Sequence, residues 1–260
     1  MSIRIAVVQQ EHNPGQVEVN RARALAAAQE ALEKGADIIL FHEELLVGYV
    51  PQPHELAEPA DGPTTQAFQR LLAGTDSLIL YGLTEVDGED DYISAILVGS
   101  DGVRARYRKT HLWASTPGMR CEPDHYKAGN EWVTFSVKGA KAGVMICYDG
   151  DFPETARSYA VLGCDLLFWM NNREQRGYDA ETAALASKNS LILAVSCCCG
   201  VDEIGQACSG GSHIVDAQGR LITELWDAPG ILYADVQPEV CAALRANNPW
   251  FNARRPELYL

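Results

Sequence analysis

The alternation of apolar and polar positions divides the chain into short strands separated by helices and turns. Residues 4–9 read as an apolar strand, and apolar positions at helical spacing predict a helix over 21–34, with Asn20 as its N-cap and Gly35 as its stop. Residues 37–41 are predicted to form the next strand. A strand–helix–strand unit at the start of the chain is typical of α/β folds. Further strands are predicted at 78–84, 93–98, 103–107, 132–137, 142–146, 166–169, 191–197, 212–216, 221–225 and 231–236, and further helices at 65–72, 153–162, 180–190 and 238–245.

The strands within residues 78–107 follow one another with no helix between them. Asp101-Gly102 is a hairpin signal before the last of them. The sheet is therefore not purely parallel, which favours the α+β class over a doubly wound fold. Turn signals are spread evenly and no repeat or linker interrupts them, so we expect one domain over residues 1–260 with a C-terminal tail from about 247 to 260.

The stretch 142–157 places a cysteine between a predicted strand and a predicted helix. An apolar run ends at Cys147, polar residues follow, and Asp151 and Pro153 suit the N-cap and first turn of a helix. A side chain at such a corner stands clear of the sheet, and the nearby helix start favours a thiolate. The stretch alone leaves open a buried structural cysteine, since free cysteines are usually small core residues.

Composition and charge narrow the class of protein. With 260 residues, 47% hydrophobic and 22% charged, the chain is an ordinary globular sequence. No apolar run approaches the roughly 20 residues that cross a bilayer. Strand-like residues begin directly after the N-terminus with no signal or transit peptide, so we expect a cytoplasmic location. A net charge of −14 argues against nucleic acid and anionic membranes as partners.

The eight cysteines are expected to be free thiols. None forms a Cys-x-x-Cys pair, and Cys197, Cys198 and Cys199 are contiguous. A zinc site that combines this run with Cys208 or His213 is disfavoured, because structural zinc ligands are usually spaced by two to four residues. We therefore expect buried thiols in a strand and no metal.

Three segments carry a resemblance to a known family. Residues 41–49 (FHEELLVGY), 107–112 (YRKTHL) and 143–154 (GVMICYDGDFPE) resemble the nitrilase superfamily of carbon–nitrogen hydrolases. The resemblance implies a four-layer α-β-β-α sandwich of two mixed sheets with helices outside, a homodimer, and chemistry that needs no metal or organic cofactor. Similarity continues through residues 186–189, 210–219 and 254–259.

The resemblance also implies a catalytic set of Glu43, Lys109 and Cys147, with Glu122 as a supporting glutamate. Glu43 would accept the thiol proton, because a thiol with its usual pKa near 8.5 is mostly protonated at neutral pH. Lys109 and the N–H of Tyr148 would stabilise the oxyanion. A thioester would form on Cys147 and water would hydrolyse it.

Spacing selects Glu43 rather than Glu44. The family glutamate lies five residues before the glycine of a Gly-Tyr pair, and here that glycine is Gly48. His42 stands where the family usually has proline.

The residues after the thiol indicate the substrate class. Cys147-Tyr148-Asp149 is amidase-like, whereas nitrilases proper carry Cys-Trp-Glu. Relatives that hydrolyse N-carbamoyl amino acids place arginines shortly after the nucleophile, where Gly150 and Asp151 stand here. We therefore expect hydrolysis of small neutral, aliphatic amides to a carboxylic acid and ammonia.

Alternatives remain open. An omega-amidase, an N-carbamoyl amide hydrolase or an acyl-transferring relative would use the same thioester, with Arg173 and Arg176 as the first candidates to bind a carboxylate. A catalytically silent binding or assembly protein is the alternative outside enzymes, although such proteins usually lose the nucleophile. The substrate-binding candidates are Tyr49, Trp113, Tyr148, Trp169 and Asn171. For Tyr49, Trp113 and Trp169 the alternative is core packing, the main use of aromatic side chains.

Overall fold

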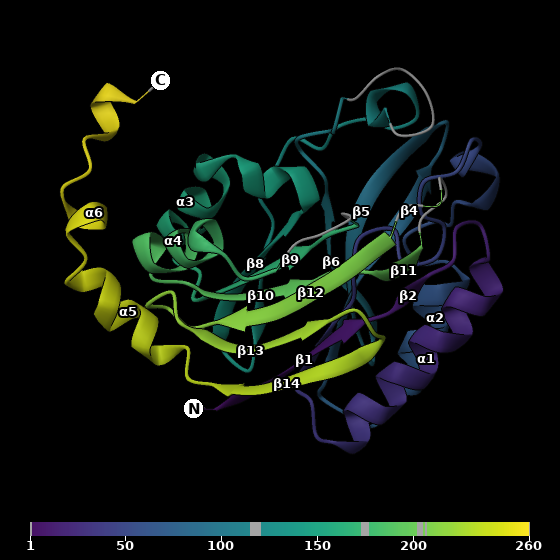
Figure 1. Ribbon diagram of the computed structural model, residues 1–260, viewed down its shortest axis with the longest axis horizontal. Helices are drawn as coiled ribbons and strands as arrows, with labels where there is room; N and C mark the ends of the chain where they lie inside the picture. The colour runs from purple at the N-terminus through teal and green to yellow at the C-terminus, as the bar shows by residue number, and fades with distance from the viewer. Residues whose placement is uncertain (1, 115–120, 173–176, 202–204, 206, 260) are drawn as a thin grey trace.

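Two mixed β-sheets lie face to face, and helices cover their outer sides (Figure 1). The computed structural model describes residues 2–114, 121–172, 177–201, 205 and 207–259. In this part of the chain no helix is long and apolar enough to cross a membrane.

The first sheet has six strands. Its central strands β1, β3 and β4 run parallel, and antiparallel strands flank them. The order is β14 (Gly230–Val236), β1 (Ile3–Gln9), β3 (Ile38–Leu40), β4 (Leu78–Asp87), β5 (Asp90–Gly99) and β6 (Gly102–Arg108).

The second sheet has eight strands and a parallel centre formed by β8, β9 and β10. β13 (Leu221–Trp226) pairs with β12 beside the main path. The path runs β2 (Glu11–His12), β11 (Cys199–Val201), β12 (Ala207–Val215), β10 (Ile192–Ser196), β9 (Leu166–Met170), β8 (Ala140–Ile146) and β7 (Thr134–Val137).

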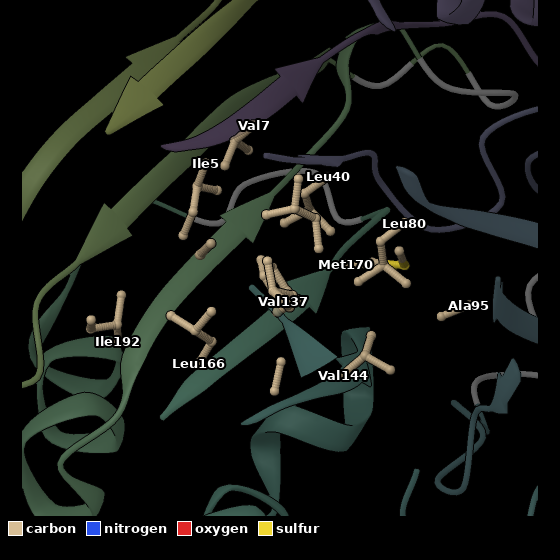
Figure 2. Close-up of a cluster of buried hydrophobic side chains, with 14 of the residues drawn as sticks. Ile5, Val7, Leu40, Leu80, Ala95, Val137, Val144, Leu166, Met170 and Ile192 are labelled. Atoms are coloured by element: carbon tan, nitrogen blue, oxygen red, sulfur yellow. The ribbon is translucent and has the colours of Figure 1, made fainter. Parts of the chain in front are cut away.

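Three apolar clusters separate four layers, and this confirms the predicted sandwich. The central cluster lies between the sheets, where Ile5 and Leu40 of the first face Val144 and Leu166 of the second (Figure 2). A second cluster joins the first sheet to its helices, and a third does the same for the second sheet. The covering helices are α1 (Val17–Glu33) and α2 (Pro63–Leu71) on the first sheet, and α3 (Pro153–Val161) and α4 (Ala180–Asn189) on the second.

Helix α1 begins one turn earlier than the sequence pattern predicts. Asn20 is buried inside the helix and is not its N-cap. Its Nδ2 donates to the carbonyls of Asn13 (2.7 Å) and Leu46 (2.8 Å). The amide therefore ties the helix to two loops, a role that asparagine can fill as well as capping. Gly35 ends the helix in the left-handed region, as predicted (φ 75°).

Helix α3 begins at Pro153 as predicted, but its N-cap is Phe152, not Asp151. The preceding residues, Cys147–Asp151, form a turn of 3-10 helix, η3, that joins the nucleophile strand to α3. Asp151 belongs to that turn, so its backbone is not available to start the next helix.

The strands β2 and β11 are too short to produce a sequence pattern, and they were not predicted. The predicted strand 191–197 ends at Ser196, so Cys197 and Cys198 lie between strands, and Cys199 opens β11. All three thiols are buried. The remaining elements are η1 (Pro53–Leu56), η2 (Glu122–Asp124), α5 (Glu239–Ala246), α6 (Pro249–Asn252) and η4 (Pro256–Leu258).

Candidate active site

The carboxyl ends of strands from both sheets meet and bring four predicted site residues together. Glu43 follows β3, Lys109 follows β6, Cys147 follows β8, and Glu122 opens η2. The side chains of Glu43, Lys109 and Glu122 are fully buried.

A buried ion cluster forms the centre of the site. The Nζ of Lys109 lies 2.7 Å from Oε1 of Glu43 and 2.6 Å from Oε1 of Glu122. The hydroxyl of Tyr49 donates to Oε1 of Glu122 (2.8 Å), and the backbone N–H of Trp113 donates to its Oε2 (2.7 Å). Because both oxygens of Glu122 are engaged, this carboxylate fixes the position of the ammonium group.

Cys147 sits at a strained corner. Its φ of 45° lies in the left-handed region, which non-glycine residues rarely adopt and which is typical of nucleophile turns. Its side chain interacts with the carboxylate of Glu43 and acts to lower the pKa of that group. The indole Nε1 of Trp169 donates to the carbonyl of Cys147 (3.0 Å), which holds the turn against the sheet.

The other oxygen of Glu43 is fixed by the loop after β9. Oε2 of Glu43 accepts the backbone N–H of Asn172 (3.0 Å). The side chain of Asn172 in turn accepts the thiol of Cys198, with Sγ 3.0 Å from Oδ1. Cys198, for which the sequence suggested no role, is thus two contacts away from the carboxylate.

Burial and charge set the protonation states of the cluster. Burial alone would lower the pKa of Lys109, but Glu43, Cys147 and Glu122 together raise it well above its usual value. Lys109 therefore remains an ammonium group. Burial raises the pKa of Glu43 although Lys109 opposes the rise, so this carboxylate is a stronger base than a solvated glutamate.

Asp149 anchors the nucleophile turn to the segment that carries Lys109. Its Oδ1 accepts the hydroxyl of Thr110 and the backbone N–H of His111, each at 2.9 Å. Its Oδ2 accepts the hydroxyl of Tyr107 (2.7 Å) and the backbone N–H of Ile146 (2.9 Å). From the sequence, Asp149 served only to distinguish amidases from nitrilases, and this structural role was missed.

A third buried glutamate, Glu44, lies next to Glu43 in the chain. Glu44 is fully buried, and its Oε1 accepts the hydroxyls of Tyr126 (2.6 Å) and Thr84 (3.2 Å). The backbone of residues 42–44 packs directly against Gly82. A Cβ at that position would lie 2.6 Å from the backbone nitrogen of Glu44 and 2.4 Å from the carbonyl oxygen of His42, so only glycine allows this close approach.

The remaining pocket candidates occupy different places. Trp113 is 43% exposed, and its ring meets the ring of Tyr148 edge to face at 5.0 Å. Trp169 is fully buried in the cluster on the helix side, and a Cβ at Gly150 would lie 2.1 Å from its ring. Asn171 directly follows β9, beside the end of β8. Its buried side-chain amide has no hydrogen-bond partner among the described residues. Arg173 and Arg176 lie outside the described residues.

The family model for carbon-nitrogen hydrolases matches residues 4–246. The chain belongs to the carbon–nitrogen hydrolase family. An (R)-stereoselective amidase of a Pseudomonas species is 32% identical over 227 residues, which cover 85% of this chain and 80% of that protein. An omega-amidase of Mus musculus is 28% identical and covers 92% of this chain and 91% of its own length.

A solved structure of an amidase is also similar to this chain. A variant of the amidase from Nesterenkonia sp. AN1 is 25% identical, with a TM-score of 0.80 over 98% of this chain and 95% of its own. In that protein the acetamide moiety of fluoroacetamide is covalently added at the active-site cysteine. The present carbon–nitrogen hydrolase is accordingly an amidase, a hydrolase that acts on carbon–nitrogen bonds.

Proposed function

We propose that this carbon–nitrogen hydrolase cleaves small neutral amides through a thioester on Cys147. The observation that carries the proposal is the contact between three groups. The side chain of Cys147 interacts with Glu43 and favours its ionised form, and Glu43 is paired with the ammonium of Lys109 in a fully buried cluster. A nucleophile, a base and an electrostatic stabiliser in contact are what amide cleavage requires.

Glu43 accepts the thiol proton as Sγ of Cys147 attacks the amide carbon. The carbonyl oxygen gains the negative charge, and Lys109 and the backbone N–H of Tyr148 stabilise it; one such donor contributes about 3 kcal/mol. The tetrahedral intermediate then loses its amine as the C–N bond breaks. Glu43 returns the proton to that nitrogen, and ammonia leaves an acyl group on Cys147.

Water completes the reaction. Glu43 takes a proton from water as its oxygen attacks the thioester carbon, and the C–S bond breaks to give the carboxylic acid. The same proton then restores the thiol of Cys147. Glu122 takes no proton in this scheme; it holds Lys109 in place and charged.

Two features support a neutral substrate. The site contains the buried carboxyl groups of Glu43, Glu44 and Glu122, and the ammonium of Lys109 is already paired with two of them. Among the described residues of this cluster, a substrate carboxylate would meet this negative charge with no second cation to balance it. An arginine cannot replace Gly150, since even a Cβ would overlap the indole behind it.

Ammonia release from a panel of amides tests the proposal. The panel holds acetamide, propionamide, both enantiomers of a chiral amide, a nitrile, an N-carbamoyl amino acid and an omega-amide of a dicarboxylate. We expect release from the simple amides, and none after Cys147→Ala. Cys241→Ala removes a buried thiol from α5 and serves as the matched control. An active Cys147→Ala variant would contradict the thioester mechanism.

Preference for the omega-amide would instead favour an omega-amidase, the activity named for the mouse relative. Arg173→Ala and Arg176→Ala would then show which arginine binds the carboxylate. Preference for the N-carbamoyl amino acid, or acyl transfer to hydroxylamine faster than hydrolysis, would favour the other two enzyme alternatives.

Iodoacetamide separates an enzyme from a catalytically silent protein. We expect rapid alkylation confined to Cys147 among the eight cysteines. Uniformly slow alkylation of all eight would favour the silent alternative.

We also propose a homodimer. The C-terminal tail lies along the outer side of α3 and α4 (Figure 1), and it exposes Trp250, Leu258 and Tyr259. Three large apolar side chains in so short a segment favour burial against a second copy. Light scattering should give twice the chain mass, and the mass of one chain would contradict the proposal.

A further inference from the structure

We propose that Glu44 is a third carboxyl group of the active site, that it is protonated in the active enzyme, and that its ionisation lowers activity at alkaline pH. This inference rests on the proposed amidase function. It assigns a role to a residue that is adjacent to the catalytic base in sequence and yet takes part in no step of the mechanism.

The first argument is the arrangement of donors around the Glu44 carboxyl. Both hydroxyls that reach it, from Tyr126 and Thr84, donate to Oε1. Oε2 is buried and has no hydrogen-bond partner among the described residues. An ionised, fully buried carboxylate with one unpartnered oxygen is strongly disfavoured, whereas a neutral carboxyl places its proton on that oxygen.

The second argument is the charge of the cluster. Glu43 and Glu122 both contact Lys109, and all three side chains are fully buried. Two carboxylates and one ammonium already give a net charge of −1. Ionised Glu44 would add a further buried negative charge, and no cation among the described residues forms an ion pair with it, so the neutral form is favoured.

The groups that face Glu44 come from every neighbouring segment. Glu43 lies on its own turn, Lys109 follows β6, and Glu122 and Tyr126 belong to the segment after residue 120. Burial comes first, followed by the charge of Glu43, and together they raise the pKa of Glu44 to about 8. Glu122 adds to the rise, and the hydroxyl of Tyr126 and the charge of Lys109 oppose it.

The direction of the pH effect follows from these signs. Below about pH 8 Glu44 is neutral, and Lys109 retains its full effect on the developing oxyanion. Above that pH the new carboxylate opposes both the thiolate of Cys147 and the oxyanion, since like charges at a buried site repel strongly. Activity should therefore fall as the pH rises through this range.

The test is kcat/KM for a simple amide between about pH 6 and about pH 10. Wild-type activity should drop about tenfold from pH 7 to pH 9, the ratio expected for a group that titrates near pH 8. Glu44→Gln keeps the size of the side chain and an acceptor for Tyr126, and the drop should be absent. Tyr126→Phe removes a bond that favours the charged form, so its drop should move to higher pH.

Glu89→Gln makes the same chemical change on the surface and should leave the pH profile unaltered. An unchanged alkaline drop in Glu44→Gln would refute the inference. If that variant does not fold, an unmoved drop in Tyr126→Phe would refute it equally.

A second measurement separates this inference from the proposed function. The rate of Cys147 alkylation by iodoacetamide, followed on its peptide, requires no amide substrate. Above about pH 8 it should rise more steeply in Glu44→Gln than in the wild type. That result without hydrolysis of any amide would overturn the proposed function and retain the role of Glu44. If simple amides are hydrolysed and the pH profiles of alkylation and of activity are the same in Glu44→Gln and the wild type, the proposed function is retained and the role of Glu44 is overturned.

Discussion

Replacing Asp149 by alanine tests whether this carboxylate holds the nucleophile turn in place. Asp149 is fully buried and accepts hydrogen bonds from two hydroxyls and from the backbone N–H groups of His111 and Ile146. One of its oxygens therefore faces the end of β8, directly before Cys147, and the other faces the segment after Lys109.

The magnitude follows from the donors that the substitution leaves behind. The hydroxyls of Tyr107 and Thr110 lie 3.1 Å apart and can pair with each other. The backbone N–H groups of His111 and Ile146 have no such substitute, and an unpartnered buried donor costs about 1–3 kcal/mol. We expect Asp149→Ala to lower the free energy of unfolding by about 4 kcal/mol, which corresponds to a fall in Tm of roughly 8–16 °C in a chain of this size.

Thermal unfolding followed by circular dichroism, together with kcat on a simple amide, provides the assay. The loosened turn should lower kcat about 100-fold, since misplacement by about 1 Å has that effect. Asp149→Asn should give about half the destabilisation. Its side-chain oxygen can accept from the backbone N–H of either Ile146 or His111, and its NH2 group then leaves the other N–H without an acceptor. Asp151→Ala changes an exposed neighbour and should shift Tm by less than about 2 °C. A Tm for Asp149→Ala within about 3 °C of the wild type would refute the reasoning.

Two further predictions concern the surroundings of Glu43. Gly82→Ala would place a Cβ 2.7 Å from the Cα of Glu43, and we expect kcat to fall about 100-fold with the circular dichroism spectrum unchanged; a loss below about twofold would contradict the crowding argument. Cys198→Ala removes the donor to Asn172 and should lower kcat/KM about fivefold, the effect of one neutral hydrogen bond. Cys198→Ser retains a donor and should recover most of the loss, whereas equal losses in both variants would indicate packing alone.

The sequence predicted most strands and helices, because their apolar runs are bounded by clear turn residues. The main error at a helix end was the prediction that Asn20 is an N-cap. Asparagine can either cap a helix or donate to buried carbonyls. Which of the two it does depends on Leu46, 26 positions away, and no local pattern contains that information.

The candidate site was predicted only in part, and for the same reason. Glu43, Lys109 and Cys147 were named from short motifs, and Glu122 from its place in the loop before the nucleophile strand. The structure brings all four together. The partners of Asp149 and Glu44 are determined by the tertiary fold, as the sequence separation of 82 between Glu44 and Tyr126 illustrates. A buried carboxyl group gives no signal in the sequence until the residues that surround it are known.

The direction in which Trp169 points is clear from the structure but could not be predicted from the sequence. Phe168 and Met170 point into the core between the sheets, so Trp169 must face the helices, because successive side chains on a strand alternate. The run 166–170 is apolar throughout and offers no polar residue to distinguish its two faces. A hydrogen bond to the carbonyl of Cys147 then makes the indole a support for the nucleophile turn, on the helix side of the sheet.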